Sequence, residues 1–250
     1  MRVVLERSNL LKSLNHVHRV VERRNTIPIL SNVLLTAGEE TLRMKATDLD
    51  LEVTEGAPAR VERGGATTVP AYLLYDIVRK LPEGAEVMLN TDENGSGMSV
   101  VAGRSTFRLQ CLPQSDFPEL SAGSFSHTFE IGSSALKGLI DKTQFAISTE
   151  ETRYYLNGIY LHAHETEGQL KLRSVATDGH RLARAEIDAP GGSEGMPGII
   201  IPRKTVGELQ KLLDLPDVVV NVELSDTKIR FTIGGVVLTS KLIDLSLIHI

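Results

Sequence analysis

Three carboxylates stand at two-residue intervals in the first half of the chain, at Asp48, Asp50 and Glu52. In an extended strand, side chains two residues apart lie on the same face. The spacing therefore predicts a carboxylate cluster that could hold Mg²⁺ for phosphodiester chemistry. This pattern makes a metal-dependent phosphoesterase or nuclease our alternative hypothesis for the function.

A second polar cluster, Asp178-Gly179-His180-Arg181, has a different composition. Asp178 could orient His180 as a base, but the sequence places no serine or cysteine nucleophile beside them. Phosphate-binding loops and the HExxH and GxSxG motifs are missing from the sequence. We therefore expect that the protein is not an enzyme and that it binds neither a resident metal nor a cofactor.

Two pairs of histidines and one cysteine could also carry chemistry. His16 and His18 would point about 200° apart on a helix, so they cannot chelate a metal together. His162 and His164 would share a strand face, but no third ligand is evident. We interpret all four as surface histidines. The single cysteine, Cys111, cannot form an internal disulfide and is interpreted as a small core residue.

The elements that must position these residues are four helices and several short strands. Four segments have the apolar spacing of amphipathic helices, and they are residues 8–24, 71–81, 133–147 and 203–213. Ser8 is a candidate N-cap for the first helix. Alternating apolar residues predict antiparallel strands at 32–36, 41–46, 98–102, 106–112, 169–176 and 228–233. The expected fold class is α+β.

The order of elements occurs twice along the chain. LRMKATD at 42–48 matches LRSVATD at 172–178, and VPAYLL at 69–74 matches IPRKTV at 201–206. Two nearly equal offsets predict tandem copies of one domain. A small-residue linker at 120–125 separates them, which gives domains at 1–122 and 123–250.

Composition excludes some classes and leaves one question open. With 250 residues, 41% hydrophobic and 24% charged, the chain is neither disordered nor fibrous. The sequence contains no apolar run long enough to span a membrane, and its first residues do not resemble a signal peptide. We therefore expect a cytoplasmic protein with no membrane contact.

The net charge of −5 is unevenly distributed. The four predicted helices hold 11 basic and 4 acidic residues, and the rest of the chain holds 16 and 28. The count fits either one basic helical surface or four separately solvated helix faces.

Several segments resemble the bacterial DNA polymerase III beta subunit, the sliding clamp family. They are TVPAYLLYDIVRKLPEGAEV, LPQSDFPEL, RYYLNGIYL, VATDGHRLA, IIIPRKTVGELQKLL and LTSKLID, and the resemblance covers residues 1 to about 244. It implies the DNA-clamp fold, with tandem domains that each pack two helices on antiparallel sheets. It also implies three domains per chain and a head-to-tail homodimer that closes into a ring with helices lining the hole.

The resemblance implies a processivity factor that encircles double-stranded DNA without reading its sequence. The implied DNA-binding residues are Arg24, Tyr154, Tyr155, Arg203 and Lys204, with Arg79, Lys80 and Lys137 as weaker candidates. Tyr72 and Leu73 stand where better-known members carry basic residues, and Glu150 stands where glutamine is usual. These departures weaken the expected DNA contact along those two loops.

A second implied site is a peptide pocket formed by Leu156, Thr177, Gly179, His180, Arg181 and Leu182. Its expected partners are short linear peptides from the DNA polymerase III catalytic subunit, the clamp loader, other polymerases and repair proteins. The competing interpretation is that Leu156 and Leu182 are core residues. A third function, a stand-alone peptide-binding adaptor, would show peptide affinity without DNA retention.

The last residues of the chain fit neither the repeat nor the resemblance. LTSKLID continues into Leu245 to Ile250 instead of the expected glycine-aromatic-proline turn. We expect a truncated chain that lacks the third domain and part of the pocket. The expected location is the cytoplasm, in association with the nucleoid.

Overall fold

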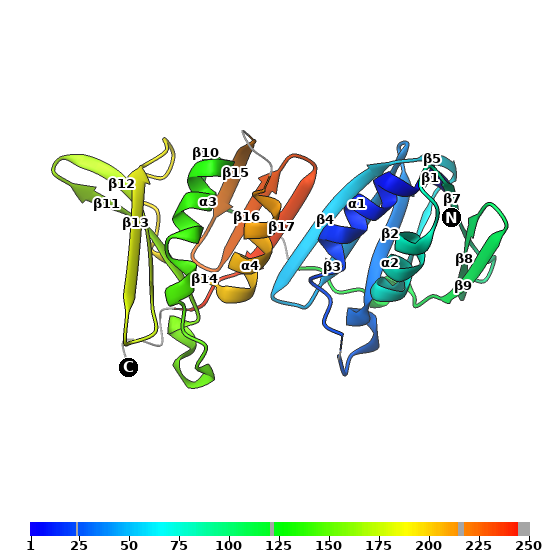
Figure 1. Ribbon diagram of the computed structural model, residues 1–250, viewed down its shortest axis with the longest axis horizontal. Helices are drawn as coiled ribbons and strands as arrows, with labels where there is room; N and C mark the ends of the chain where they lie inside the picture. The colour runs from blue at the N-terminus through cyan, green and yellow to red at the C-terminus, as the bar shows by residue number, and fades with distance from the viewer. Residues whose placement is uncertain (24, 121–122, 215–217, 245–250) are drawn as a thin grey trace. The chain divides into compact units, whose positions relative to one another are not determined.

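Two compact units make up the computed structural model, residues 1–120 and 121–250 (Figure 1). The structure describes residues 1–23, 25–120, 123–214 and 218–244. Within these described residues, each unit has two α-helices packed on antiparallel strands. The predicted α+β class is confirmed.

The described residues of the first unit form nine strands and two α-helices. In chain order they are β1 (Arg2–Glu6), α1 (Arg7–Val17), β2 (Asn32–Gly38), β3 (Thr41–Thr47), β4 (Leu51–Pro58), β5 (Arg60–Arg63), β6 (Gly65–Pro70), α2 (Ala71–Lys80), β7 (Glu86–Thr91), β8 (Gly97–Ala102) and β9 (Ser105–Gln110). One sheet has the order β5-β1-β7-β8-β9, and a second set of paired strands has the order β4-β3-β2-β6. Short 3₁₀ helices lie at Pro28–Ser31 and Gln114–Asp116.

The second unit repeats this plan. Its elements are β10 (His127–Gly132), α3 (Ser133–Asp141), β11 (Gly158–Thr166), β12 (Gln169–Thr177), β13 (Leu182–Asp188), β14 (Ile199–Pro202), α4 (Arg203–Leu212), β15 (Val219–Leu224), β16 (Lys228–Ile233) and β17 (Val236–Lys241). The strand orders are β10-β15-β16-β17 and β13-β12-β11-β14. Short 3₁₀ helices lie at Gln144–Ala146 and Glu151–Leu156.

The strand registers of the two units agree residue by residue. Leu34 pairs with Lys45 and Thr68 in the first unit. Tyr160 pairs with Val175 and Ile200 in the second unit. The repeat seen in the sequence is therefore a repeat of strand pairing, so positions in one unit have defined counterparts in the other.

One face of each four-strand set packs against the first helix of its unit. In the first unit, His16 of α1 lies 2.7 Å from the buried Glu55 carboxylate of β4. In the second unit, the hydroxyl of Ser174 on β12 lies 3.5 Å from the Leu139 carbonyl of α3. Side chains that alternate with Glu55 and Ser174 therefore lie on the opposite face, which we call the outer face.

The first helix is shorter than the expected 8–24 and ends at Val17. His18 caps the end of the helix: its amide donates to the Leu14 carbonyl at 3.0 Å, and its Nδ1 lies 2.6 Å from the same oxygen. Val20 and Val21 are buried, as the apolar stripe predicts, but they lie in turns beyond the helix. Ser8 is not the N-cap, because its hydroxyl donates to Glu6 Oε1 instead.

The third helix also ends early, at Asp141 rather than residue 147. The Thr143 hydroxyl donates to the Leu139 carbonyl at 2.7 Å and lies 2.8 Å from the Ser174 hydroxyl. This side-chain bond favours a break, after which the chain forms a 3₁₀ turn at Gln144–Ala146.

Across the described ranges, no helix combines the length and apolar character that a membrane span requires.

Candidate functional site

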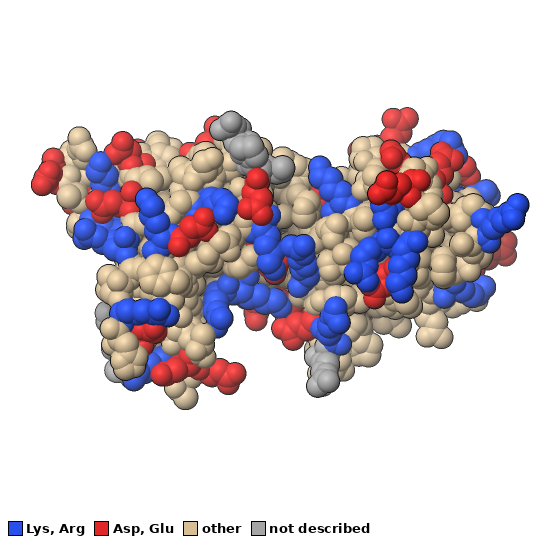
Figure 2. Space-filling model, in the orientation of Figure 1, with Lys and Arg blue, Asp and Glu red and all other residues tan. Residues whose placement is uncertain are grey.

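Basic side chains lie over the helices of each unit, with acidic residues among them (Figure 2). In the first unit, Lys12, Arg19, Arg23 and Lys80 are exposed on or next to α1 and α2. Arg24, the first-named DNA-binding prediction, lies outside the described residues. The basic character predicted for the helices is therefore present around α1 and α2.

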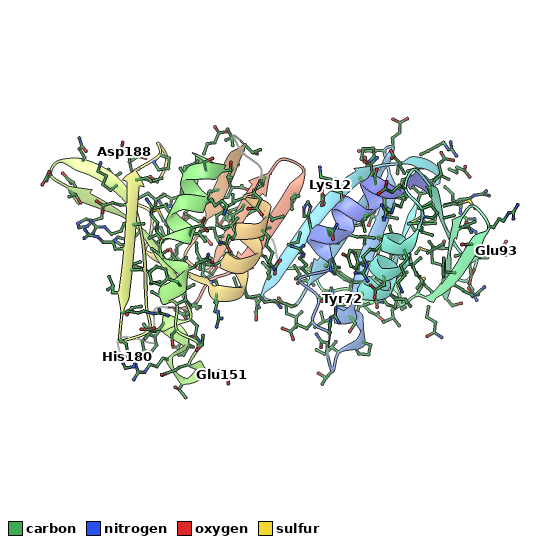
Figure 3. The ribbon with its side chains drawn as sticks, viewed as in Figure 1. Lys12, Tyr72, Glu93, Glu151, His180 and Asp188 are labelled. Atoms are coloured by element: carbon green, nitrogen blue, oxygen red, sulfur yellow. The ribbon has the colours of Figure 1, made fainter. Side chains whose placement is uncertain are left out.

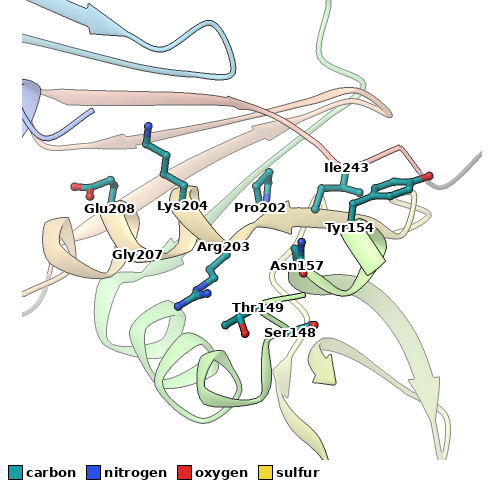
Figure 4. Close-up of a pocket in the computed structure, with 10 residues that line it drawn as sticks. All are labelled: Ser148, Thr149, Tyr154, Asn157, Pro202, Arg203, Lys204, Gly207, Glu208 and Ile243. Atoms are coloured by element: carbon teal, nitrogen blue, oxygen red, sulfur yellow. The ribbon is translucent and has the colours of Figure 1, made fainter. Parts of the chain in front are cut away.

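Three predicted DNA-binding residues of the second unit surround one cavity of about 610 Å³ (Figure 4). They are Tyr154, Arg203 and Lys204. The backbone of α4 begins at Arg203, whose amide donates to the Asn157 carbonyl at 2.8 Å. Two cations at a helix N-terminus, where backbone amides also point outward, form a surface suited to phosphate.

The structure separates the two neighbouring tyrosines. Tyr154 lines the cavity beside α4, whereas Tyr155 lines a different, apolar pocket. Their rings meet edge to face, with centroids 5.8 Å apart. Of the two tyrosines predicted to bind DNA, only Tyr154 therefore lies beside Arg203 and Lys204, and Tyr155 lies in the apolar pocket.

Two of the weaker DNA-binding candidates have acidic neighbours. Lys137 Nζ lies 3.0 Å from Asp141 and 3.7 Å from Asp214. Its hydrogen bond to Asp141 raises the lysine pKa by favouring the charged form. Arg79 lies 3.0 Å from Asp76. These local pairs offset part of the positive charge that either side chain could offer to phosphate.

The apolar pocket has a volume of about 310 Å³ and lies at one end of the outer face of the β11–β14 region. Its lining residues are Tyr155, Leu156, Gly158, Tyr160, Val175, Ala176, Thr177 and Ile200. Of the six predicted pocket residues, Leu156 and Thr177 line it directly. Gly179, His180, Arg181 and Leu182 belong instead to the adjoining turn and the start of β13.

That turn is fixed by the side chains of Thr177 and Asp178. The Thr177 hydroxyl donates to the Arg181 carbonyl at 2.7 Å and accepts from the Gly179 amide at 3.1 Å. Asp178 Oδ1 accepts from the amides of His180 and Arg181, each at 3.0 Å. These amides, with the Arg181 guanidinium, lower the pKa of Asp178 to about 2. The carboxylate therefore holds the turn together while charged.

Leu182 is 66% exposed, so the interpretation of this residue as core is wrong. It pairs with Thr177 across β12 and β13 and therefore lies on the outer face beside the pocket. An apolar side chain with this exposure at the rim of an apolar pocket is suited to contact a ligand. Phe145, which is also exposed, meets the Arg181 guanidinium at 5.5 Å from its ring centroid.

Five residues that line the pocket were not among the predicted site residues: Gly158, Ala176, Tyr160, Val175 and Ile200. The last three form one row across β12, β11 and β14, because Tyr160 pairs with both Val175 and Ile200. The signal was present in the alternation: Ile159 and Leu161 point inward, which leaves Tyr160 on the outer face. Val175 and Ile200 occupy the paired outward positions on the neighbouring strands, so the three side chains together form an apolar patch.

The carboxylates at 48–52 do not form the predicted strand face. Asp48 and Asp50 lie in the turn before β4, and Asp48 Oδ1 accepts from the amides of Asp50 and Leu51. Glu52 is on β4 and lies 3.7 Å from Lys45. The ATD motif thus forms the same kind of turn in both units, and the premise of a metal-binding strand face is wrong.

The histidine interpretation needs correction. His18 is buried, and His162 is partly buried with Nδ1 that has no hydrogen-bond partner in the described part of the chain. Burial, with Arg173 and His164 nearby, lowers the pKa of His162. Cys111 is partly buried, and burial raises the pKa of its thiol, which disfavours a nucleophilic thiolate.

Two family models match the chain. DNA polymerase III beta subunit, N-terminal domain, matches residues 1–121, and DNA polymerase III beta subunit, central domain, matches residues 130–247.

Known relatives are similar in sequence to this chain over nearly its whole length. The beta sliding clamp of Caulobacter vibrioides is 51% identical over 244 residues, which cover 98% of this chain and 66% of that protein. The beta sliding clamp of Escherichia coli K12 is 42% identical over 245 residues, which cover 98% and 65%. The chain therefore spans slightly less than two thirds of the length of these relatives.

Solved structures agree with the fold. A DNA polymerase III subunit beta sliding clamp from Bartonella birtlesii, bound to griselimycin, has 62% identity and a TM-score of 0.94. The aligned part covers 98% of this chain and 65% of that one. A Caulobacter crescentus beta sliding clamp has 51% identity and a TM-score of 0.96, with the same coverage.

Proposed function

We propose, because the chain belongs to the DNA polymerase III beta subunit family, that it acts as a sliding clamp that holds duplex DNA and tethers replication proteins to it. The observation that carries the proposal is the convergence of Tyr154, Arg203 and Lys204 on one cavity at the start of α4. Cations and an aromatic ring contact phosphate, sugar and base faces without reading sequence. A clamp that slides needs contacts of this kind.

We further propose that the full-length form, with a third domain, works as a head-to-tail homodimeric ring. One supporting feature is strand β9, which ends the order β5-β1-β7-β8-β9 and carries the 38% exposed Phe107. An edge strand with an exposed aromatic residue offers both backbone hydrogen bonds and apolar area to another chain. The ring would place the duplex against the helices of each unit.

The pocket beside β11 is proposed to bind short peptides of the polymerase, the clamp loader and repair proteins. Its lining is almost wholly apolar, and Gly158 forms part of it without a side chain. A Cβ at Gly158 would collide with the Ile201 carbonyl and the Ile200 side chain. The missing side chain of Gly158 therefore lets β11 and β14 pack closely, and the apolar hollow beside them is suited to bury the aliphatic and aromatic anchors of an extended peptide.

We propose that the chain has no catalytic activity of its own and acts in the cytoplasm with the nucleoid. We place the domain boundary between residues 122 and 123, close to the division of the two compact units and to the family-model limits. The metal-dependent nuclease remains testable by hydrolysis assays with Mg²⁺. Activity that disappears in Asp50→Asn would overturn the non-enzymatic assignment.

The DNA proposal is tested by fluorescence anisotropy with a labelled duplex over a series of salt concentrations. We expect the Arg203→Ala/Lys204→Ala variant to lower the slope of log affinity against log salt by about 0.9 for each phosphate that it no longer neutralises. Arg184→Ala is the matched control, because Arg184 is exposed on β13, away from α4. An unchanged slope in the double variant would contradict the proposal.

Peptide binding is tested separately with a labelled peptide that carries leucine and phenylalanine anchors. Griselimycin, which the Bartonella relative was solved with, serves as a competitor. Specific peptide binding with no measurable DNA binding would favour the stand-alone adaptor over the clamp.

A further inference from the structure

An aromatic stack joins the end of α1 to α2 in the first unit. Tyr72 and Tyr75 stand three residues apart on α2, so they lie on one side of that helix. The His18 ring lies parallel to Tyr75, with centroids 3.9 Å apart and planes within 8°. It meets Tyr72 edge to face at 5.4 Å. Tyr72 is labelled at the start of α2 in Figure 3.

The stack also fixes the chain that follows α1. The Tyr72 hydroxyl donates to the Val21 carbonyl at 3.1 Å, and His18 Nδ1 lies 2.6 Å from the Leu14 carbonyl. Val20 and Val21 are buried beneath this segment. Residues 18–21 are therefore anchored at both ends although they are not helical, and the position of Arg23 that follows them is defined.

The guanidinium of Arg23 lies on the exposed side of this stack. Its Cζ is 4.7 Å from the centroid of the Tyr72 ring, a cation–π distance. In the described part of the chain, no acidic side chain forms an ion pair with Arg23. Arg79 differs, because it lies 5.5 Å from the Tyr75 centroid and also pairs with Asp76.

A guanidinium that rests on a ring keeps its N–H edges available. The ring contacts the flat face of the group, whereas hydrogen bonds to phosphate use the edges. Holding the side chain in place also reduces the rotamer freedom that binding removes. Tyr72 thus supplies no charge itself but fixes the charge of Arg23 over the start of α2.

We propose that Arg23 contacts a backbone phosphate of duplex DNA and that Tyr72 is its positioning residue. This inference rests on the proposed DNA-binding function and adds a contact in the first unit. It also gives the non-basic residue at position 72 a role. The sequence departure at Tyr72 no longer weakens this surface, because the positive charge comes from Arg23.

The test measures duplex affinity of the full chain by anisotropy over a salt series. We expect Arg23→Ala to weaken binding about tenfold at 50 mM salt and to lower the salt slope by about 0.9, the value for one phosphate. Arg43→Ala is the matched control. Arg43 is exposed and alternates with the buried Met44, so it lies on the outer face away from α1.

Variants of Tyr72 separate positioning from folding. Tyr72→Phe keeps the ring and should stay within twofold of the parent, whereas Tyr72→Leu should lose most of the affinity that Arg23→Ala loses. In the Arg23→Ala background, Tyr72→Leu should have no further effect on affinity. Thermal unfolding of each variant identifies any that fail to fold.

Each outcome separates this inference from the proposed function. If Arg23→Ala leaves the slope unchanged while Arg203→Ala/Lys204→Ala lowers it, the inference is wrong and the clamp function stands. If neither variant changes the slope, the DNA-binding function itself is wrong. Equal losses for Tyr72→Leu with and without Arg23 would overturn the positioning role alone.

Discussion

The outer faces of the two units have the same strand register but differ in the polarity of their side chains. In the first unit one cross-strand row contains Lys45, Leu34 and Thr68. The matching row of the second unit contains Val175, Tyr160 and Ile200. The backbone is equivalent, but a mixed polar row in one unit is apolar in the other.

The first unit fills its own hollow. Phe117, only 7% exposed, packs in a cluster with Ile29, Leu30 and Leu34. The segment that carries Phe117 is attached to the sheet by Leu112, whose amide donates to the Thr68 carbonyl at 3.3 Å. The hydroxyl of Thr68 donates back to the Leu112 carbonyl at 2.9 Å.

The second unit has the same attachment, and its hollow is open among the described residues. Ile243 takes the place of Leu112, and its amide donates to the Ile200 carbonyl at 3.0 Å. Tyr155, Leu156 and Tyr160, the counterparts of Ile29, Leu30 and Leu34, line the 310 Å³ pocket. One position in the fold therefore stabilises the first unit and is proposed to bind peptides in the second. The packing of Phe117 illustrates the kind of side chain that the hollow accepts.

The largest effect is expected from emptying the filled hollow. Phe117→Ala should destabilise the first unit by about 3 kcal/mol, because it removes a buried aromatic ring and leaves a cavity. Urea denaturation followed by a probe in each unit measures the change. Leu73→Ala, at an exposed position of α2, is the control. Equal effects of the two variants would show that Phe117 is not a core residue.

A lysine in the pocket of the second unit, at the position equivalent to Lys45, should weaken peptide binding. Val175→Lys introduces the residue type of Lys45 into the pocket, where its ammonium would lose water without a partner. We expect at least a tenfold loss of peptide affinity by anisotropy, equivalent to about 1.4 kcal/mol. Lys45→Val should leave peptide affinity unchanged. Retained binding in Val175→Lys would place the peptide elsewhere.

Leu182 tests the rim of the pocket. Leu182→Ala should weaken peptide binding about fivefold and leave the melting temperature unchanged, because an exposed side chain contributes to binding rather than to the core. Calorimetry and anisotropy on the same sample measure both quantities. Collapse of the fold would return Leu182 to the core.

The two ATD turns differ in the cost of their left-handed residue. Leu49 has φ 82° and Gly179 has φ 88°, a region that glycine adopts readily and leucine does not. Leu49→Gly should stabilise the first unit and Gly179→Ala should destabilise the second, each by about 1 kcal/mol. At Gly179 a Cβ would also lie 2.9 Å from Arg153 Nη1. Denaturant midpoints measure both changes, and the same sign for both would refute the comparison.

The smallest effect concerns pH. Hydrogen bonds from the backbone of Arg181 and His180 lower the pKa of Asp178 to about 2. Because the folded pKa is below the ordinary value, its stabilisation is complete above pH 4 and disappears as the pH falls through 2. The Asp178 carboxyl signal in an NMR titration should therefore stay ionised at pH 3. Asp178→Asn removes this transition, and a midpoint near 4 would show that the turn does not hold the carboxylate.

Local patterns predicted the elements that depend on nearby residues. The helices at 71–80 and 203–212 end within one residue of expectation, since their apolar spacing continues to the end. The first and third helices end early, at points where the side chains of His18 and Thr143 contact backbone carbonyls, and periodicity does not reveal these contacts. The prediction for the carboxylates at 48–52 was also wrong. Their two-residue spacing does not reveal that Asp48 Oδ1 accepts from the amides of Asp50 and Leu51 and so forms a turn before β4.

The sequence by itself determined the tandem repeat and the α+β class. These follow from short-range spacing and from similarity between two parts of one chain. Only the tertiary structure decided that Phe117 fills one hollow, that Tyr160 and Ile200 line the other, and that Arg23 rests on Tyr72. Each of these contacts joins segments far apart in the chain, and the energy of such packing depends on distances that no local pattern encodes.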